Sequence, residues 1–118
     1  MRKLALALAL LAGCSSQPAP PDLDAGTGLL KEVLQAWKDG AGHESLASRS
    51  PPVVVADPAW TAGQKLAKFE VEEGAKQSGH DVRCVAKLWL DGADSPVTVA
   101  YSVSLSPKRV VVRDPFGG

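Results

Sequence analysis

The spacing of apolar side chains changes partway along this chain, and that change constrains the fold more than any other feature. In residues 27–40, four apolar side chains recur at the spacing of one helix face: Leu30, Val33, Leu34 and Trp37. From residue 66 onward, apolar side chains alternate with polar ones, as in strands with one buried face. A helix followed by strands and short turns is typical of an α+β domain. We therefore expect a helix, capped by Thr27 and ended by Gly40, that packs on a sheet.

Four segments carry the alternating pattern: 66–73, 82–90, 97–105 and 110–113. The pair Asp91-Gly92, which follows the second segment, is a strong hairpin signal. Residues 74–81 are a polar turn region. Because each segment has one apolar and one mostly polar face, we expect a curved four-stranded antiparallel meander. One face of this sheet would pack on the helix and the other would meet water.

The segment between the main helix and the first alternating segment contains shorter elements. A second helix is expected from about His43 to Arg49, and Pro51-Pro52 would end it. Val53–Val55 is a short β-branched run. Residues 57–61 begin with Asp-Pro and predict a turn or a single helical turn, because proline is preset for that conformation.

The N-terminus has the three-part layout of a secretory signal. Arg2 and Lys3 are basic, residues 4–12 are apolar, and small residues lead into a cysteine. The apolar run is too short to span a bilayer as a helix. We therefore expect residues 1–13 to be a signal peptide. Residues 14–26 are rich in proline and serine and would form a flexible tether. The domain would then cover residues 27–114, followed by a frayed tail over residues 115–118.

The sequence Leu11-Ala12-Gly13-Cys14 resembles the lipobox of bacterial lipoproteins. This resemblance implies cleavage between Gly13 and Cys14, and lipid attachment to Cys14. The protein would then be held in the cell envelope by its N-terminal lipid. Ser15 follows the cysteine, which in enteric-type lipoproteins resembles outer-membrane sorting. The resemblance thus implies the outer membrane, facing the periplasm, rather than the inner membrane.

The order of the expected elements is similar to that of the cystatin-like, or nuclear-transport-factor-like, fold of the ketosteroid-isomerase type. The resemblance includes the helix end at Trp37 and Gly40, the Pro51-Pro52 segment, and Trp60. Enzymes of that type use an acidic base and an oxyanion hole inside the sheet's cone, and the hole is typically a tyrosine beside a protonated acid. Tyr101 is the only tyrosine, and we expect it in the core with its hydroxyl at the rim. The acidic candidates, Asp57 and Glu44, both fall outside the predicted sheet, so no catalytic residue is predicted.

Other chemistries have little support in the sequence. His43 and His80 are the only histidines, and with Cys84 they do not form a metal set, which needs three or four ligands. No serine nucleophile has a histidine and acid arranged for it, and no glycine pattern fits a phosphate. The chain has 13 basic and 13 acidic side chains, so nucleic acid is not expected as a partner. No metal or cofactor is predicted, and Cys84 is expected to be a buried, unreactive thiol.

Four aromatic side chains remain as candidate site residues. Trp37, Trp60 and Tyr101 would line a pocket if the space between helix and sheet is open, and would fill the core if it is closed. Trp89 falls on the open face of the sheet with Arg83 and Lys87. An aromatic ring beside basic residues can anchor a protein interface. Alternatively, Trp89 packs across its neighbouring strands.

The sequence as a whole indicates a lipid-anchored envelope protein with a small, non-catalytic domain that acts as a binding or structural module. Its partners would be the membrane, through the lipid, and an envelope protein. Two alternatives stay open: a small-molecule binder that uses the cavity between helix and sheet, and a degenerate enzyme of the isomerase type. The oligomeric state also stays open.

Overall fold

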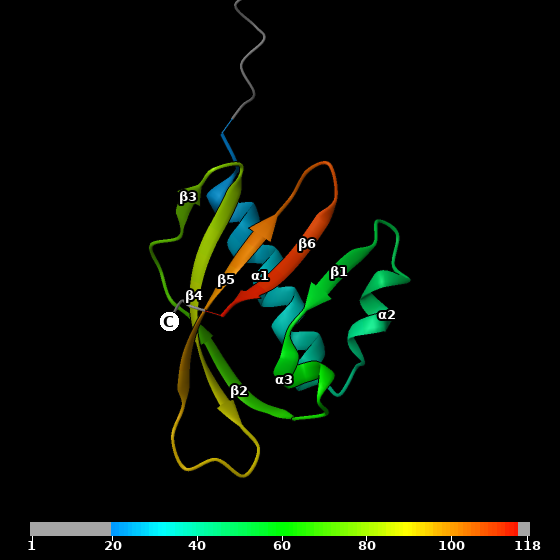
Figure 1. Ribbon diagram of the computed structural model, residues 1–118, viewed down its shortest axis with the longest axis vertical. Coiled ribbons are helices and arrows are strands. Elements are labelled where there is room, and N and C mark those ends of the chain that lie inside the picture. Colours follow the sequence, from blue (N-terminus) through cyan, green and yellow to red (C-terminus); the bar gives the residue numbers. More distant parts are fainter. Residues whose placement is uncertain (1–19, 116–118) are drawn as a thin grey trace, which may run out of the picture.

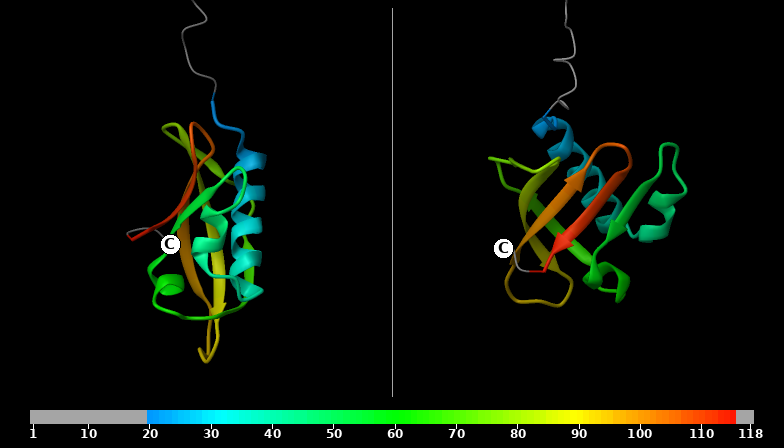
Figure 2. Two further views of the ribbon diagram at one scale, coloured as in Figure 1. Left: turned by 90° about the vertical axis from the view of Figure 1, so that its right-hand side faces the viewer. Right: turned by 45° about the horizontal axis from the view of Figure 1, so that its top comes forward.

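The computed structural model describes residues 20–115, so the signal peptide, Gly13, Cys14 and residues 116–118 lie outside the described part. Helix α1 (Leu23–Lys38) lies across one face of a curved sheet, and two short helices, α2 (His43–Ala47) and α3 (Pro58–Thr61), lie near its C-terminal end (Figures 1 and 2). The strands are β1 (Val53–Ala56), β2 (Leu66–Val71), β3 (Lys76–Ser78), β4 (Asp81–Leu90), β5 (Val97–Ser104) and β6 (Arg109–Asp114). The predicted α+β class is confirmed.

The sheet is mixed and has six strands, so the predicted four-stranded antiparallel meander is wrong. Its order is β1-β6-β5-β4-β2, and β3 also pairs with β4. Strand β1 runs parallel to β6, with Val53 opposite Arg109, while the other pairs are antiparallel. The β-branched run at Val53–Val55 lies in β1, as suits branched side chains on a pleated surface. Since β1 is the first strand in the order, it is an edge strand of the sheet. The polar region expected as a turn supplies the short strand β3.

Helix α1 begins four residues earlier than the sequence predicts. Asp22 caps it, because its side chain accepts a hydrogen bond from the Ala25 amide at 3.0 Å. Thr27, the expected cap, lies inside the helix, and its hydroxyl donates to the Leu23 carbonyl. Residues 23–26, which we expected in the tether, are therefore helical. Past the other end, Gly40 has φ = 91°, the left-handed conformation expected beyond a helix terminus.

Gly26 allows α1 to approach the sheet closely. A Cβ atom at this position would lie 2.7 Å from the side chain of Val82 on β4. The next residue, Thr27, brings its hydroxyl to 4.0 Å from the Cys84 sulfur, also on β4. The absence of a side chain at Gly26 thus sets where the first turn of α1 rests on the sheet.

Side chains fill the space between α1 and the sheet. The helix contributes the predicted stripe, and β4, β5 and β6 contribute the following buried residues: Val82, Cys84, Ala86, Leu88, Tyr101, Val103 and Val111. Cys84 is 1% exposed, so its predicted burial is confirmed. Burial raises the pKa of the Cys84 thiol, and the hydrogen bond with Thr27 offsets part of that rise. The burial of Trp37 in this core is likewise as predicted.

Candidate functional site

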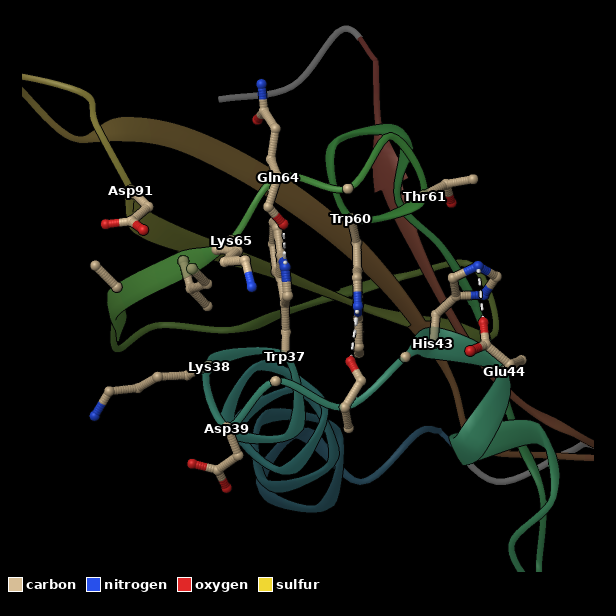
Figure 3. A pocket seen from close by; sticks show the side chains of 16 residues that line it. Trp37, Lys38, Asp39, His43, Glu44, Trp60, Thr61, Gln64, Lys65 and Asp91 are labelled. Atoms are coloured by element: carbon tan, nitrogen blue, oxygen red, sulfur yellow. Dashed lines mark hydrogen bonds and ion pairs between the residues drawn. The ribbon is translucent and has the colours of Figure 1, made fainter.

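Two of the three aromatic residues that the sequence marked for a pocket lie in direct contact. Trp37 is in the last turn of α1 and Trp60 is in α3. Their ring centroids are 5.4 Å apart and their planes differ by 9°, so the indoles are stacked. Trp37 is 3% exposed and Trp60 is 6% exposed. The pair closes the core at the C-terminal end of α1 (Figure 3).

Each indole N–H binds the loop beside the other tryptophan. Trp37 Nε1 donates to the carbonyl of Gln64 at 2.8 Å, in the loop between α3 and β2. Trp60 Nε1 donates to the carbonyl of Ala41 at 3.1 Å, in the loop between α1 and α2. Helix α1 thus holds the loop between α3 and β2, and α3 holds the loop between α1 and α2 (Figure 3). Because buried indole N–H groups need partners, these two bonds fix both loops against the stack.

These two loops form the walls of a surface groove of about 560 Å³. Charged and polar side chains lie at the edges of this groove: Lys38, Asp39, His43, Glu44, Lys65 and Asp91 (Figure 3). The His43 ring meets the Trp60 ring edge-on at 6.2 Å. His43 Nε2 lies 3.5 Å from a Glu44 carboxylate oxygen. The groove therefore offers both signs of charge over a floor fixed by the two stacked rings.

Three of the charged side chains at the groove make no ion pair within residues 20–115: Lys38, Lys65 and Asp91. Asp39 accepts a hydrogen bond from the Gln35 side chain at 2.9 Å. Unpaired charges beside a fixed, concave surface are free to meet a ligand without first breaking an internal contact. A small number of polar groups around a largely preformed hollow is typical of binding sites.

A second polar cluster is buried behind α3. Asp57 is 2% exposed, and its carboxylate accepts a hydrogen bond from the Tyr101 hydroxyl at 2.6 Å. Arg113 Nη2 lies 3.0 Å from one Asp57 oxygen and 3.1 Å from the other. The Ala59 amide donates to Asp57 Oδ1, which makes Asp57 the cap of α3. We refer to Asp57, Tyr101 and Arg113 as the buried acid cluster.

This cluster corrects the expected position of the Tyr101 hydroxyl and shows a contact of Asp57 that was not expected. The Tyr101 hydroxyl is not at the rim, because the whole residue is 1% exposed. Asp57 lies outside the strands, as predicted, but its side chain points inward to Tyr101 on β5 and Arg113 on β6. The physical reason is that Tyr101 and Arg113 are opposite each other in adjacent strands, so both reach the end of β1. Tyr101 does not line the groove.

The electrostatics of the buried acid cluster favour a structural role. Burial raises the pKa of Tyr101, and the negative charge of Asp57 raises it further. Both carboxylate oxygens of Asp57 already accept hydrogen bonds from within the protein. A general base needs a free oxygen within reach of the proton that it removes. Asp57 is 2% exposed, so its carboxylate is out of reach of a substrate in this arrangement. Glu44, the other acidic candidate, lies at the groove.

On the outer face of the sheet, the predicted interface residues contact their own neighbours. Trp89 is half-buried, and the Lys68 ammonium lies 4.6 Å from the centre of its ring. Arg83 forms an ion pair of 2.8 Å with Asp114, and Lys87 lies opposite Glu70 in the register. The register and the contact with Lys68 favour packing across strands for Trp89.

Within residues 20–115, no group of three or more metal-ligating side chains comes together. His80 lies in the turn between β3 and β4, and His43 is the first residue of α2. None of the helices in this part of the chain is long and apolar enough to cross a membrane. Comparison with protein-family models, with curated proteins and with solved structures found no match.

Sequence reasoning missed the link between Asp57 and Arg113. Arg113 alternates with Val111, which places a charged side chain on the buried face of the last strand. A charge on a buried face requires a partner, and so does the hydroxyl of a buried tyrosine. These two requirements together would have indicated a nearby acid.

Proposed function

We propose that this protein is a lipid-anchored cell-envelope lipoprotein whose domain is a non-catalytic binding module. Its binding site is the groove beside Trp37 and Trp60. The observation that carries this proposal is the reciprocal bonding of the two indoles, because it holds both groove walls in place before a ligand arrives. Binding to a preformed surface avoids the entropy cost of ordering loops.

Two features support a binding role over an enzymatic one. The interior between α1 and the sheet is filled by buried side chains, which leaves the groove as the accessible hollow next to the aromatic residues. Asp57, the acid that is buried within residues 20–115, is held by Tyr101, Arg113 and the Ala59 amide. The order of elements, with α1 packed on a curved sheet, is consistent with a nuclear-transport-factor-like architecture, which we include in the proposal.

The envelope location rests on the sequence Leu11-Ala12-Gly13-Cys14. In this proposal Cys14 carries the lipid, and several acyl chains give a firm anchor, because one chain alone binds membranes only marginally. A Cys14→Ser variant should accumulate as an unprocessed precursor that takes up no labelled fatty acid. Continued labelling of this variant would show that the anchor is elsewhere. Fractionation that places the protein in the inner membrane would overturn the outer-membrane assignment.

The groove assignment is tested by photo-crosslinking in cells. A photo-crosslinking amino acid replaces Lys65 at the groove, and a matched variant carries it at Lys108, an exposed lysine in the turn between β5 and β6. We expect a discrete adduct from position 65 and none from position 108. Equal adducts from both positions, or none from position 65, would contradict a binding role for the groove.

A further inference from the structure

Helix α3 has four residues, which is too few to hold a helical conformation without outside contacts. Forming a single turn fixes several backbone angles for one hydrogen bond, so an isolated turn of this length is unfavourable. The position of α3 must therefore come from the groups that it touches at its two ends.

At its N-terminal end, α3 is tied to the sheet through one side chain. Asp57 Oδ1 accepts from the Ala59 amide at 3.0 Å, and the Asp57 carbonyl accepts from the Thr61 amide at 2.9 Å. The same carboxylate is held by Tyr101 on β5 and by Arg113 on β6. Because the Asp57 carboxylate is charged, its hydrogen bonds with Tyr101 and Arg113 are stronger than hydrogen bonds between neutral groups. Asp57 thus connects two strands to the first turn of α3.

At its C-terminal end, α3 contacts both walls of the groove through Trp60 and the Ala59 carbonyl. Trp60 stacks on Trp37 and binds the Ala41 carbonyl, while the Ala59 carbonyl accepts from the Gln64 amide at 3.0 Å. Gln64 in turn accepts the bond from Trp37. Both walls of the groove therefore depend on where α3 lies. Asp57, Tyr101 and Arg113 do not themselves line the groove.

We infer that the buried acid cluster is a positioning device for the groove: it sets the location of α3 and, through Trp60, the stacking of the two indoles and the separation of the groove walls. This inference rests on the proposed function for its biological meaning. The cost of the cluster supports a positioning role. Arg113 Nε is buried and has no hydrogen-bond partner within the described residues. Burying a charge pair is seldom the most stable solution, so its use suggests a need for one specific geometry.

Circular dichroism provides a direct readout, because two stacked indoles couple their transitions and give a paired positive and negative band. A Trp60→Phe variant of the full chain defines the spectrum without coupling. In Asp57→Asn, the cap of α3 is retained, since asparagine is also a good cap, but the charge opposite Arg113 is lost. We expect the coupled signal to fall about two-fold or more, because weaker docking shifts α3 toward other conformations. The far-UV signal of the sheet should remain.

Asp22→Asn is the matched control, because Asp22 also caps a helix through its side chain but lies at the far end of α1. Its coupled signal should equal that of the unmodified protein. An unchanged coupled signal in folded Asp57→Asn would overturn the inference. If Asp57→Asn does not fold, Tyr101→Phe takes its place, and an unchanged signal there would overturn the inference equally. Absence of a crosslink from the position-65 photo-crosslinking variant, with Asp57 unchanged, would count against the proposed function alone.

Discussion

Replacing Trp37 with alanine removes the largest side chain of α1 from the core, and its effect can be worked from the structure. The side chain is 3% exposed and stacks on Trp60. Truncating a buried tryptophan usually costs about 3–5 kcal/mol. Loss of the hydrogen bond from Trp37 Nε1 adds little to this free-energy cost. Its acceptor is the carbonyl of the exposed residue Gln64, which can bind water instead. We therefore expect about 3–5 kcal/mol in total, most of it from lost packing.

A domain of this size often has only about 5–10 kcal/mol of total stability, so Trp37→Ala should be unfolded or nearly so at room temperature. Urea unfolding followed by far-UV circular dichroism measures this, and the proteins are compared by unfolding midpoint, because loss of the indole coupling changes only the amplitude of the signal. Trp89→Ala is the matched control, since Trp89 is a half-buried tryptophan on the outer face. It should lose clearly less stability than Trp37→Ala. A folded Trp37→Ala variant with an unchanged unfolding midpoint would refute the filled core and indicate a wet pocket at Trp37.

Three further predictions concern buried groups. Gly26→Ala should destabilise the domain by about 1–3 kcal/mol in urea unfolding, because the new methyl group would overlap Val82. An unfolding midpoint equal to that of the unmodified protein would mean that α1 can shift freely on the sheet. The Cys84 thiol should react slowly with a thiol reagent in the folded protein and quickly in urea. Rapid labelling of the folded protein would mean that Cys84 lies on the exposed face of β4. Because the pKa of Tyr101 is raised in the folded state, its phenol stays protonated while the unfolded chain ionises above about pH 10, so stability falls with pH there. Tyr101→Phe should remove this part of the decline, and an alkaline unfolding series with the same slope in both proteins would contradict the burial of the phenol.

The main helix and the phases of the long strands could be predicted because each has a strong hydrophobic period. Val82, Cys84 and Leu88 face the core in β4 as the alternation indicates. Strand β3 could not be found this way, because Lys76, Gln77 and Ser78 are all polar and exposed and show no alternation. The start of α1 was missed because a capping aspartate among prolines is also typical of a flexible segment.

The pairing of β1 with β6 was beyond sequence reasoning for a different reason. A four-residue strand carries no information about its partner, and each paired residue here is 56 positions away along the chain, as in Val53 and Arg109 (109 − 53). The same separation explains the buried acid cluster. Asp57 precedes a proline and resembles an exposed helix cap, and only the fold brings it to Tyr101 and Arg113. Trp37 and Trp60 were both expected near the core, because Trp37 continues the apolar stripe of the main helix and Trp60 follows the Asp-Pro turn.

The most direct test of a lipid-anchored envelope protein is the mass of its N-terminal peptide, measured on protein extracted from membranes. We expect a chain that begins at Cys14, with a diacylglyceryl group on the sulfur and an acyl group on the amine. A chain that retains Met1, or one that begins at Cys14 with an unmodified thiol, would contradict it.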